Sequence, residues 1–480
     1  MRERAFVGGT WAAADSGRTF PVRNPATGEL LAEVPAMGQL ETRRAVEAAA
    51  EALPAWRAKS GKERGRLLRR WFELIVTHQD ELATLVTLEQ GKPFVESRGE
   101  IGLGASYVEW FAEEAKRVYG DVIPSPAADR RMLVLKQPLG VCAGITPWNF
   151  PHAMVTRKVA PGLAVGCTFV LKPAEQTPLS ALALAVLAEE AGIPAGVFNV
   201  VTGGADDAPL IGRELTSHPA VRKLGFTGSS AVGKLLMAQC AQSVKKVGLE
   251  LGGNAPFIVF DDANLDAAVA GAVTAKFRNA GQVCVSANRL LVQAGIHDEF
   301  VARLSQAAAK LRLGNGLEAG VSVGPLIDEP GFAKVVEHVE DARSRGARAV
   351  VGGAPSELGR TFFPPTVLTG VSADMLLCQE ETFGPVAGIV KFTSDDDAIA
   401  LANATPFGLA AYFYSRDINR IWHVAESLET GMVGINTAQI ANEAAPFGGV
   451  KESGIGREGS KYGIEEWVEV KYCCFGDLGS

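Results

Sequence analysis

One cysteine and one glutamate have the residue types and the sequence surroundings that covalent catalysis needs. Cys284 lies in the small-residue segment FRNAGQVCVSANR, just after Gly281, which breaks a helical pattern. Glu250 lies near the end of the apolar segment VGLEL, where packing alone does not account for a carboxylate and where burial would raise its pKa toward the range of a general base. The pair predicts a thiol that attacks a carbonyl and a base that activates water to release the acyl product.

Further polar residues follow predicted strands, where α/β folds bind ligands. Asn149 follows a strand and a proline turn in GITPWNFP and is placed to aim its amide at an oxyanion, although asparagine in a turn is most often a turn residue. Lys172 and Glu175 follow the strand TFVLK, a place suited to a cofactor ribose. Gly228 and Gly233 flank a helix N-terminus that suits a pyrophosphate, although their spacing departs from the GxGxxG fingerprint.

An alternation of apolar runs and helix-period segments supplies the elements that must position these residues. From about residue 140 onward the pattern is typical of βαβ units and a parallel sheet, so the fold class is α/β. The strands expected in the first unit are 168–172, 197–201, 221–226 and 245–251, with helices near 178–191, 207–216 and 230–243. The strands expected in the second unit are 255–260, 289–294, 347–352, 385–392, 410–415 and 432–436, with a helix near 264–280.

The remaining segments predict helices near the N-terminus and two strands that lie far apart in the sequence. Long helices are expected at 41–58 and 63–90. The segments RRMLVLKQP (130–138) and EEWVEVKY (465–472) have the mixed polarity of exposed strands. We expect these two strands to pair in an oligomer.

The composition excludes several classes of protein. The chain has 480 residues, 47% of them hydrophobic and 21% charged, which indicates a compact protein with at least two large domains. A formal net charge of −7 gives no basic stripe for nucleic acid or a membrane surface. The seven cysteines have neither disulfide-framework nor CxxC spacing, so neither a disulfide scaffold nor a metal site is expected. The N-terminus has no apolar signal segment, and we expect a cytoplasmic protein.

Several motifs, in this order along the chain, together resemble the aldehyde dehydrogenase superfamily. They are PWNF, KPAEQTP, FTGSS, LELGG, FRNAGQVC, EETFGPV (380–386) and PFGGVKESGIGRE (446–458). The resemblance covers nearly the whole chain and implies two Rossmann-type α/β domains with a small β oligomerisation domain. The implied boundaries are 1–118 with 139–252 for NAD binding, 253–452 for catalysis, and 119–138 with 453–480 for assembly into a homodimer or homotetramer.

The same resemblance assigns roles to individual residues. Cys284 would attack an aldehyde, Asn149 and the Cys284 backbone N–H would hold the oxyanion, and Glu250 would activate the water that hydrolyses the thioester. The residues expected to bind the cofactor are Trp148, Lys172, Glu175, Gly228, Ser229, Gly233, Glu381 and Phe383. The Glu175 carboxylate would repel a 2′-phosphate, which favours NAD, while NADP stays open because some relatives with this glutamate use it.

Within the superfamily the sequence is most similar to succinate-semialdehyde dehydrogenases, through TRKVAPGLAVGC (156–167), KFRNAGQVC and GREGSKYGIEEWVEVKY (456–472). That resemblance implies that Arg157 and Arg278 bind the distal carboxylate of the substrate, because a guanidinium can grip two carboxylate oxygens. The alternative for Arg157 is an arginine paired with an acid. The expected apolar wall of the substrate tunnel consists of Phe150, Met154 and Phe447.

Two departures from the subfamily pattern keep other substrates open. Ala441 stands where the subfamily usually has a serine that contacts the carboxylate, and His152 stands where a small residue is expected. A histidine there would either add a donor for a different anion or be a satisfied structural imidazole. Glutarate semialdehyde and a sulfonated C3 aldehyde are therefore alternatives to succinate semialdehyde. A cofactor-independent thiol esterase acting through Cys284, and a catalytically silent scaffold on the same fold, are the alternatives from other classes.

Overall fold

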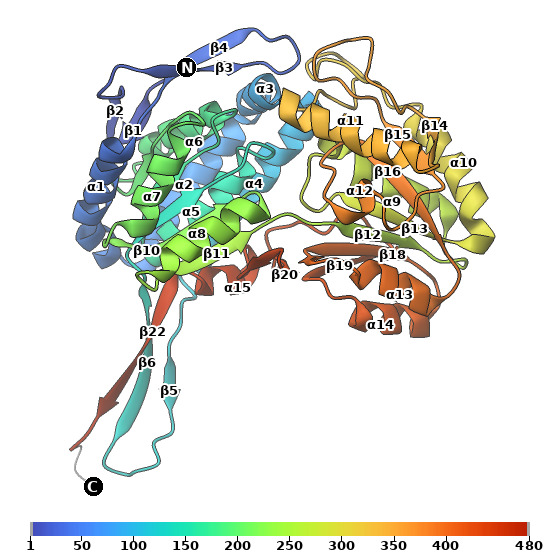
Figure 1. Cartoon of the computed structure of the whole chain (residues 1–480). Coiled ribbons are helices and arrows are strands. Elements are labelled where there is room, and N and C mark those ends of the chain that lie inside the picture. The colour runs from blue at the N-terminus through green and yellow to red at the C-terminus, as the bar shows by residue number, and fades with distance from the viewer. Residues whose placement is uncertain (1–2, 478–480) are drawn as a thin grey trace.

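In the computed structural model, which describes residues 3–477, an eight-stranded sheet organises the half of the molecule that contains the N-terminus (Figure 1). Its five central strands are parallel, and antiparallel strands close both edges. In sheet order the strands are β2 (Thr10–Ala12), β1 (Ala5–Val7), β9 (Phe198–Val200), β8 (Thr168–Lys172), β7 (Val141–Ile145), β10 (Val221–Thr227), β11 (Lys246–Glu250) and β21 (Gly454–Ile455). The carboxyl ends of β7, β10 and β11 lie next to one another, as a parallel sheet requires.

Helices cover both faces of this sheet, which explains why β8 is buried along its whole length. The helices whose apolar side chains share a core with one face are α2 (Gly61–Thr77), α3 (Gln79–Gln90), α4 (Phe94–Glu114), α5 (Ala153–Val165) and α6 (Pro178–Glu190). The helices of the core on the other face are α1 (Gln39–Ala58), α7 (Ala208–Ser217) and α8 (Ser230–Ala241). A hairpin of β3 (Thr19–Arg23) and β4 (Leu30–Pro35) lies outside this sheet.

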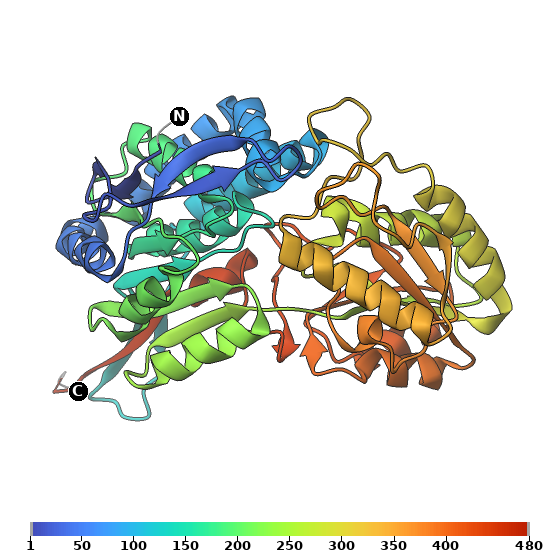
Figure 2. The same cartoon turned by 45° about the horizontal axis from the view of Figure 1, so that its top comes forward.

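A second, seven-stranded sheet organises the other half of the molecule (Figures 1 and 2). In sheet order its strands are β14 (Arg348–Val351), β15 (Thr366–Thr369), β16 (Val386–Phe392), β13 (Ala287–Gln293), β12 (Ala255–Val259), β18 (Ala410–Tyr414) and β19 (Met432–Ile435). The helices that flank it are α9 (Leu265–Phe277), α10 (His297–Ala308), α11 (Glu329–Ser344), α12 (Leu376–Gln379), α13 (Asp395–Asn403) and α14 (Ile418–Ser427). The predicted α/β class with two strand-and-helix units is confirmed.

A three-stranded arm projects from the first half (Figure 1). It consists of β5 (Asp121–Ile123), β6 (Arg131–Pro138) and β22 (Val468–Phe475). The two strands predicted far apart in the sequence are β6 and β22, and they pair antiparallel within one chain, from Val468 opposite Pro138 to Phe475 opposite Arg131. The pairing expected in an oligomer is therefore already made inside the chain.

Two predicted helices differ from the observed ones. The helix expected at 63–90 is divided into α2 and α3, because His78 between them leaves the helical conformation at φ −101° and ψ 24°. The acidic side chains of Asp80 and Glu81 stabilise the new N-terminus at α3. The helix expected near 264–280 is α9, and it ends at Phe277.

The C-terminal part of the chain returns to the first half. β21 pairs with β11, and α15 (Ser460–Glu465) contacts α4 and α5. A short pair of strands, β17 (Phe407–Gly408) and β20 (Val450–Lys451), precedes β21. The domain boundaries inferred from the sequence stay a prediction. Within residues 3–477, no helix is both long and apolar enough to cross a membrane.

Candidate active site

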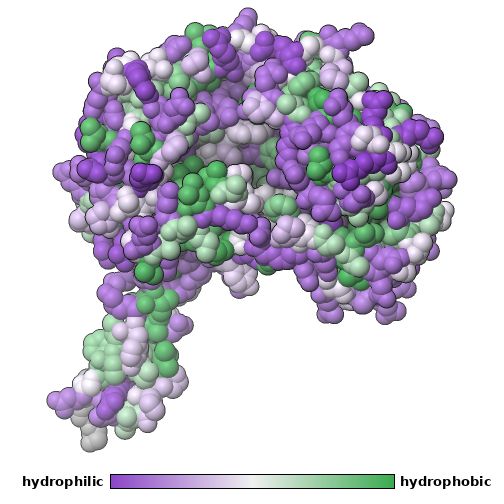
Figure 3. Space-filling model, viewed as in Figure 1, coloured by the Kyte–Doolittle hydropathy of each residue, from purple (hydrophilic) through white to green (hydrophobic). Residues whose placement is uncertain are grey.

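A cavity of about 280 Å³ lies where the carboxyl ends of β7, β10 and β11 face the loop before β13. The molecular surface is hollowed between the two halves (Figure 3). The predicted site residues that line the cavity are Trp148, Asn149, Phe150, Met154, Arg157, Gly228, Ser229, Glu250, Arg278, Cys284, Glu381, Phe383 and Phe447. Lys172, Glu175 and Gly233 are not among its lining residues. The fold thus gathers most of the predicted residues around one space.

The loop that carries Cys284 begins with an unusual backbone turn. Asn279 and Ala280 have φ angles of 50° and 54°, a left-handed conformation that ends α9 and redirects the chain. The Gln282 side chain then fixes the loop, since its Nε2 donates to Asn279 O at 3.0 Å and its Oε1 accepts from Ile327 N at 2.9 Å. These hydrogen bonds hold the loop that presents Cys284 to the cavity.

The Cys284 thiol is protonated in this environment. Burial raises its pKa to about 12, and the positive charges of Arg157 and Arg278 only partly oppose that rise. A thiolate therefore needs either a base or an additional positive charge in the cavity.

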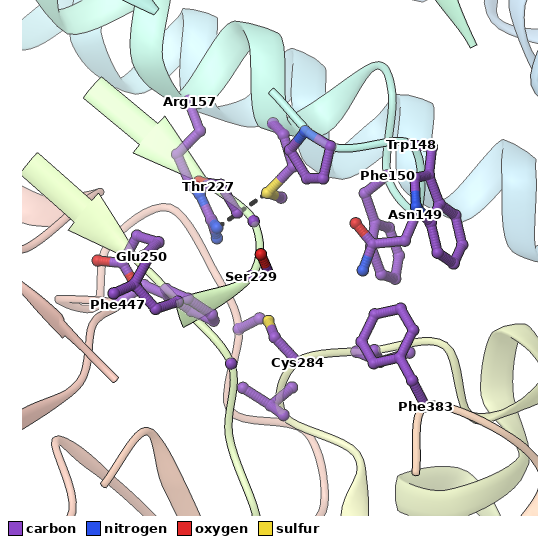
Figure 4. Close-up of a pocket in the computed structure, with 18 of the residues that line it drawn as sticks. Trp148, Asn149, Phe150, Arg157, Thr227, Ser229, Glu250, Cys284, Phe383 and Phe447 are labelled. Atoms are coloured by element: carbon purple, nitrogen blue, oxygen red, sulfur yellow. Dashed lines mark hydrogen bonds between the residues drawn. The ribbon is translucent and has the colours of Figure 1, made fainter. Parts of the chain in front are cut away.

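Asn149 points into the same cavity as Cys284 (Figure 4). Its Nδ2 donates to Gln282 O at 3.0 Å, which ties the predicted oxyanion donor to the loop of the nucleophile. Its backbone oxygen accepts from Lys92 Nζ at 2.6 Å and from Asn279 Nδ2 at 3.1 Å. These contacts restrict where the amide can stand, as an oxyanion donor requires.

Lys92 belongs to a buried ion pair that the sequence reasoning missed. Lys92 Nζ lies 2.6 Å from Glu100 Oε2 with both side chains fully buried, and Glu100 Oε1 accepts from the backbone N–H groups of His152 and Ala153. The pair thus holds the start of α5 next to Asn149. No local motif signals it, because Lys92 precedes α4 and Glu100 lies inside a helix with mixed charges.

Glu250 ends β11, as predicted, with its carboxylate buried. Its Oε2 has no hydrogen-bond partner among the described residues. Burial, and next the negative charge of Glu458, raise its pKa well above the ordinary value, against the opposing charges of Arg157 and Lys158. Figure 4 shows Glu250 beside Phe447, on the opposite side of the cavity from Asn149. A carboxyl group with this proton affinity is suited to take a proton from water.

Arg157 satisfies both interpretations made from the sequence, because it lines the cavity and is also paired with an acid. Its Nε lies 2.7 Å from Glu458 Oε2, and its guanidinium carbon lies 4.1 Å from the ring centroid of Phe447. Lys158 Nζ forms an ion pair with the other oxygen of Glu458. Lys158 and Glu458 were missed as site residues. The adjacent cations Arg157 and Lys158 could have indicated them. All residues of α5 are buried, and two buried positive charges need an acidic partner.

Arg278 stands in a different environment from Arg157. Its guanidinium carbon lies 5.6 Å from the ring centroid of Phe150, and its side chain is exposed. Within residues 3–477 it forms no salt bridge and donates no hydrogen bond, although its charge lowers the pKa of the Glu96 carboxyl against the larger effect of burial. Its donors are available to a ligand in the cavity.

The residues expected to hold the cofactor form two groups. Trp148 and Phe383 meet edge to face with ring centroids 5.5 Å apart, beside Glu381 at the cavity wall. Burial raises the pKa of Glu381 to about 7, while its Oε1 accepts only from Gly253 N at 3.2 Å. This carboxylate retains acceptor capacity for ribose hydroxyls, so the residues fit a dinucleotide.

The second group follows β8 and β10, the two strands on either side of β7. Lys172 Nζ and Glu175 Oε2 form an ion pair at 3.0 Å beyond the end of β8. Ser229 caps α8 by accepting from Val232 N. Gly233 lies one turn inside α8, where its N–H donates to Ser229 O and where a Cβ would stand 2.4 Å from Leu251. Its lack of a side chain lets the helix pack closely.

The two departures from the subfamily pattern fall in different places. Ala441 lines the cavity, whereas His152 is not among the lining residues. The His152 ring is fully buried, with its Nδ1 2.3 Å from where a Cβ on Gly104 would stand. Burial lowers its pKa to about 3, so the imidazole is neutral, and neither ring nitrogen has a hydrogen-bond partner among the described residues. His152 packs between α4 and α5. The structural imidazole expected from the sequence was one with hydrogen-bonded ring nitrogens, and these nitrogens have no such partner.

Comparisons with known proteins agree with this geometry. The model of the aldehyde dehydrogenase family matches residues 11–473. A 3-sulfolactaldehyde dehydrogenase of Pseudomonas putida and a glutarate-semialdehyde dehydrogenase of Pseudomonas aeruginosa are each 62% identical to this chain, covering 100% of it and 98% of the relative. The NADP-linked succinate-semialdehyde dehydrogenase of Escherichia coli is 60% identical, over 99% of this chain and 98% of the relative. A crystal structure described as an NADP-dependent enzyme of Escherichia coli superposes with a TM-score of 0.98 at 60% identity, covering 99% and 98% of the two chains.

The chain therefore belongs to the aldehyde dehydrogenase family. It is an oxidoreductase that oxidises aldehydes with NAD or NADP, and relatives named succinate-semialdehyde dehydrogenase are among the most similar. The resemblance recognised from the sequence motifs is confirmed. Among residues 3–477 no cluster of three or more histidine, cysteine or acidic side chains is arranged to hold a metal ion.

Proposed function

We propose that this enzyme oxidises a short aldehyde that carries a distal anionic group, with succinate semialdehyde converted to succinate as the principal reaction. The observation that supports this proposal is Arg278, an exposed arginine at the wall of the catalytic cavity that forms no salt bridge with another described residue. An unpaired guanidinium beside apolar walls attracts a carboxylate or a sulfonate. The three relatives compared above are named for aldehydes that share a distal anion, which supports the same substrate class.

The proposed reaction assigns a role to each catalytic residue. The Cys284 thiol gives up its proton to solvent water, the thiolate Sγ attacks the aldehyde carbon, and Asn149 Nδ2 with the Cys284 N–H donates to the oxyanion. The bound nicotinamide cofactor supplies the hydride acceptor. Glu250 then takes a proton from water, which attacks the thioester and releases the acid. The raised pKa of Glu250 supports its assignment as this base.

We further propose that NAD is preferred over NADP. The Glu175 carboxylate, paired with Lys172 beyond the end of β8, would accept from ribose hydroxyls and repel a 2′-phosphate. The relative from Escherichia coli is named for NADP, so both cofactors must be compared.

A sulfonated C3 aldehyde is the second candidate substrate. Ala441 supplies only a methyl group to the cavity wall, which leaves room for the three oxygens of a sulfonate or for an additional methylene. Glutarate semialdehyde, which is one methylene longer than succinate semialdehyde, tests whether the cavity accepts a longer substrate.

The proposed assembly is a homodimer or homotetramer that uses the β5, β6 and β22 arm, whose exposed apolar residues include Val122, Val470 and Phe475.

The test is NADH formation with succinate semialdehyde, glutarate semialdehyde, 3-sulfolactaldehyde and butyraldehyde, each with NAD and NADP. We expect the anionic aldehydes to have higher kcat/KM values than butyraldehyde. Arg278→Met should raise KM for the anionic aldehydes by about 10- to 100-fold and leave butyraldehyde unchanged, because it removes a charge-assisted hydrogen bond. Arg66→Met on the exposed side of α2 is the matched control. Equal efficiency with butyraldehyde would overturn the proposed substrate class.

A further inference from the structure

Arg157 lies at the junction of the substrate cavity and a buried cluster of charges. Its side chain is 2% exposed and lines the cavity, while its Nε is 2.7 Å from Glu458 Oε2. The same carboxylate pairs through its other oxygen with Lys158, whose side chain is fully buried. Glu458 is therefore shared between two cations, of which Arg157 lines the cavity and Lys158 does not.

Beyond Glu458, the Arg157 guanidinium interacts with the uncharged Tyr107 hydroxyl. Its Nη2 contacts Met154 Sδ at 3.1 Å, shown as the dashed line in Figure 4, and a thioether is a weak acceptor. The Phe447 ring at 4.1 Å supports the guanidinium plane from the side. Arg157 thus has donor capacity left for an anion in the cavity, although its charge is already partly neutralised by Glu458.

We propose that Glu458 is a positioning residue that sets the affinity of the cavity for anionic substrates, because it shares Arg157 with the distal anion of the substrate. Two anions that share one cation repel each other, so Glu458 weakens the binding of the substrate anion. Lys158 has the opposite effect, because it attracts the Glu458 carboxylate and leaves more of the Arg157 charge available. An uncharged aldehyde is insensitive to this balance.

This inference rests on the proposed function, since it concerns how strongly the distal anion is bound. It predicts opposite effects for two substitutions inside the same buried cluster. Glu458→Gln keeps the shape and removes the competing charge. Lys158→Met keeps most of the volume and leaves Glu458 with Arg157 as its nearest cation.

The experiment measures KM and kcat for succinate semialdehyde and butyraldehyde with the full-length variants at one fixed pH. The ratio of the two KM values is the readout, because a general disturbance of the site changes both substrates alike. Glu458→Gln should lower the ratio of the succinate semialdehyde KM to the butyraldehyde KM by about fivefold, the equivalent of one weak ion pair. Lys158→Met should raise it by a similar factor.

Two further variants serve as controls. Glu452→Gln removes a carboxylate from the same C-terminal segment, where Glu452 forms an exposed pair with Lys234, and it should leave the ratio unchanged. In an Arg157→Met background, Glu458→Gln should no longer change the ratio, because the shared cation is gone.

An unchanged ratio in both Glu458→Gln and Lys158→Met, or a higher ratio in Glu458→Gln, would overturn the inference. If Glu458→Gln fails to fold, Lys158→Met alone decides, since only a raised ratio supports the proposal. A wild-type enzyme without a preference for the anionic aldehyde would instead refute the proposed function. The two failures are therefore distinguishable.

Discussion

The two sides of the catalytic cavity differ in how their polar groups are satisfied. On one side, which we call the paired corner, Glu250 lies close to a cluster in which Arg157 and Lys158 neutralise Glu458. On the other side, which we call the open wall, Cys284 is a free thiol and Arg278 forms no salt bridge within residues 3–477. The difference indicates that the paired corner is preset by the fold, whereas the open wall is completed by the substrate and the cofactor.

The largest effect is expected at the open wall, from loss of the nucleophile. Cys284→Ala should lower aldehyde oxidation by about 10⁴-fold or more, because the covalent step has no alternative thiol in the cavity. Steady-state NADH formation is the measurement, and Cys474→Ala on the exposed β22 strand is the control, which should keep full activity. Activity within tenfold of the wild type would place the nucleophile elsewhere.

The next effect tests the paired corner. Glu250→Gln should leave a first burst of NADH and lower the steady-state rate by about 10³-fold, because formation of the thioester proceeds without the base that hydrolyses it. Rapid-mixing kinetics separate the two phases. Loss of the burst together with turnover would show that Glu250 is already required for the first step.

The paired corner also predicts the direction of a pH dependence. Glu250 accepts a proton only in its ionised form, and burial and Glu458 raise its pKa, so thioester hydrolysis should slow as the pH falls. Glu458→Gln removes a neighbouring negative charge, so the pH at which hydrolysis begins to slow should move to a lower value. The rate of hydrolysis after the burst, measured against pH, checks both statements. If hydrolysis in Glu458→Gln begins to slow at a higher pH than in the wild type, the Glu458 charge does not raise the pKa of Glu250.

A smaller effect is expected at the oxyanion donor of the open wall. Asn149→Ala should lower kcat/KM by about 10²-fold, because one preorganised donor is lost at the developing oxyanion. The Lys92 and Asn279 contacts go to the backbone oxygen of Asn149 and survive the substitution, so the loop should stay in place. Thermal unfolding of the variant checks its stability. A large fall in Tm would show that the lower kcat/KM comes from a disturbed structure and not from the lost oxyanion donor.

The smallest effect concerns the cofactor, outside both sides of the cavity. Glu175→Gln should improve the NADP to NAD ratio of kcat/KM by about tenfold, because it removes the repulsion of a 2′-phosphate and releases Lys172 to attract it. Kinetics with saturating aldehyde and varied cofactor provide the measurement. An unchanged ratio would remove Glu175 from the determinants of cofactor preference.

Local sequence patterns were sufficient for much of the fold and for Cys284, whereas Arg278 was assigned only through the family resemblance. The α/β class, the strand that ends at Glu250 and the loop of Cys284 follow from apolar runs and helix breakers in the sequence. The split at His78 was missed because no glycine or proline marks it. The pairing of β6 with β22 was expected in an oligomer and is found inside the chain, because strand patterns do not tell whether a partner strand belongs to the same chain.

By itself, the sequence determined which residues have reactive side chains and which strand or loop each one follows, because those properties depend on neighbours along the chain. Only the tertiary structure decided that Glu458 neutralises Arg157 and Lys158, that Lys92 and Glu100 hold Asn149, and that Arg278 forms no salt bridge among the described residues. Glu458 lies 300 residues from Lys158 in the chain. The physical reason is that charges interact through space, and the distances that set their pairing and their pKa values exist only after the chain has folded.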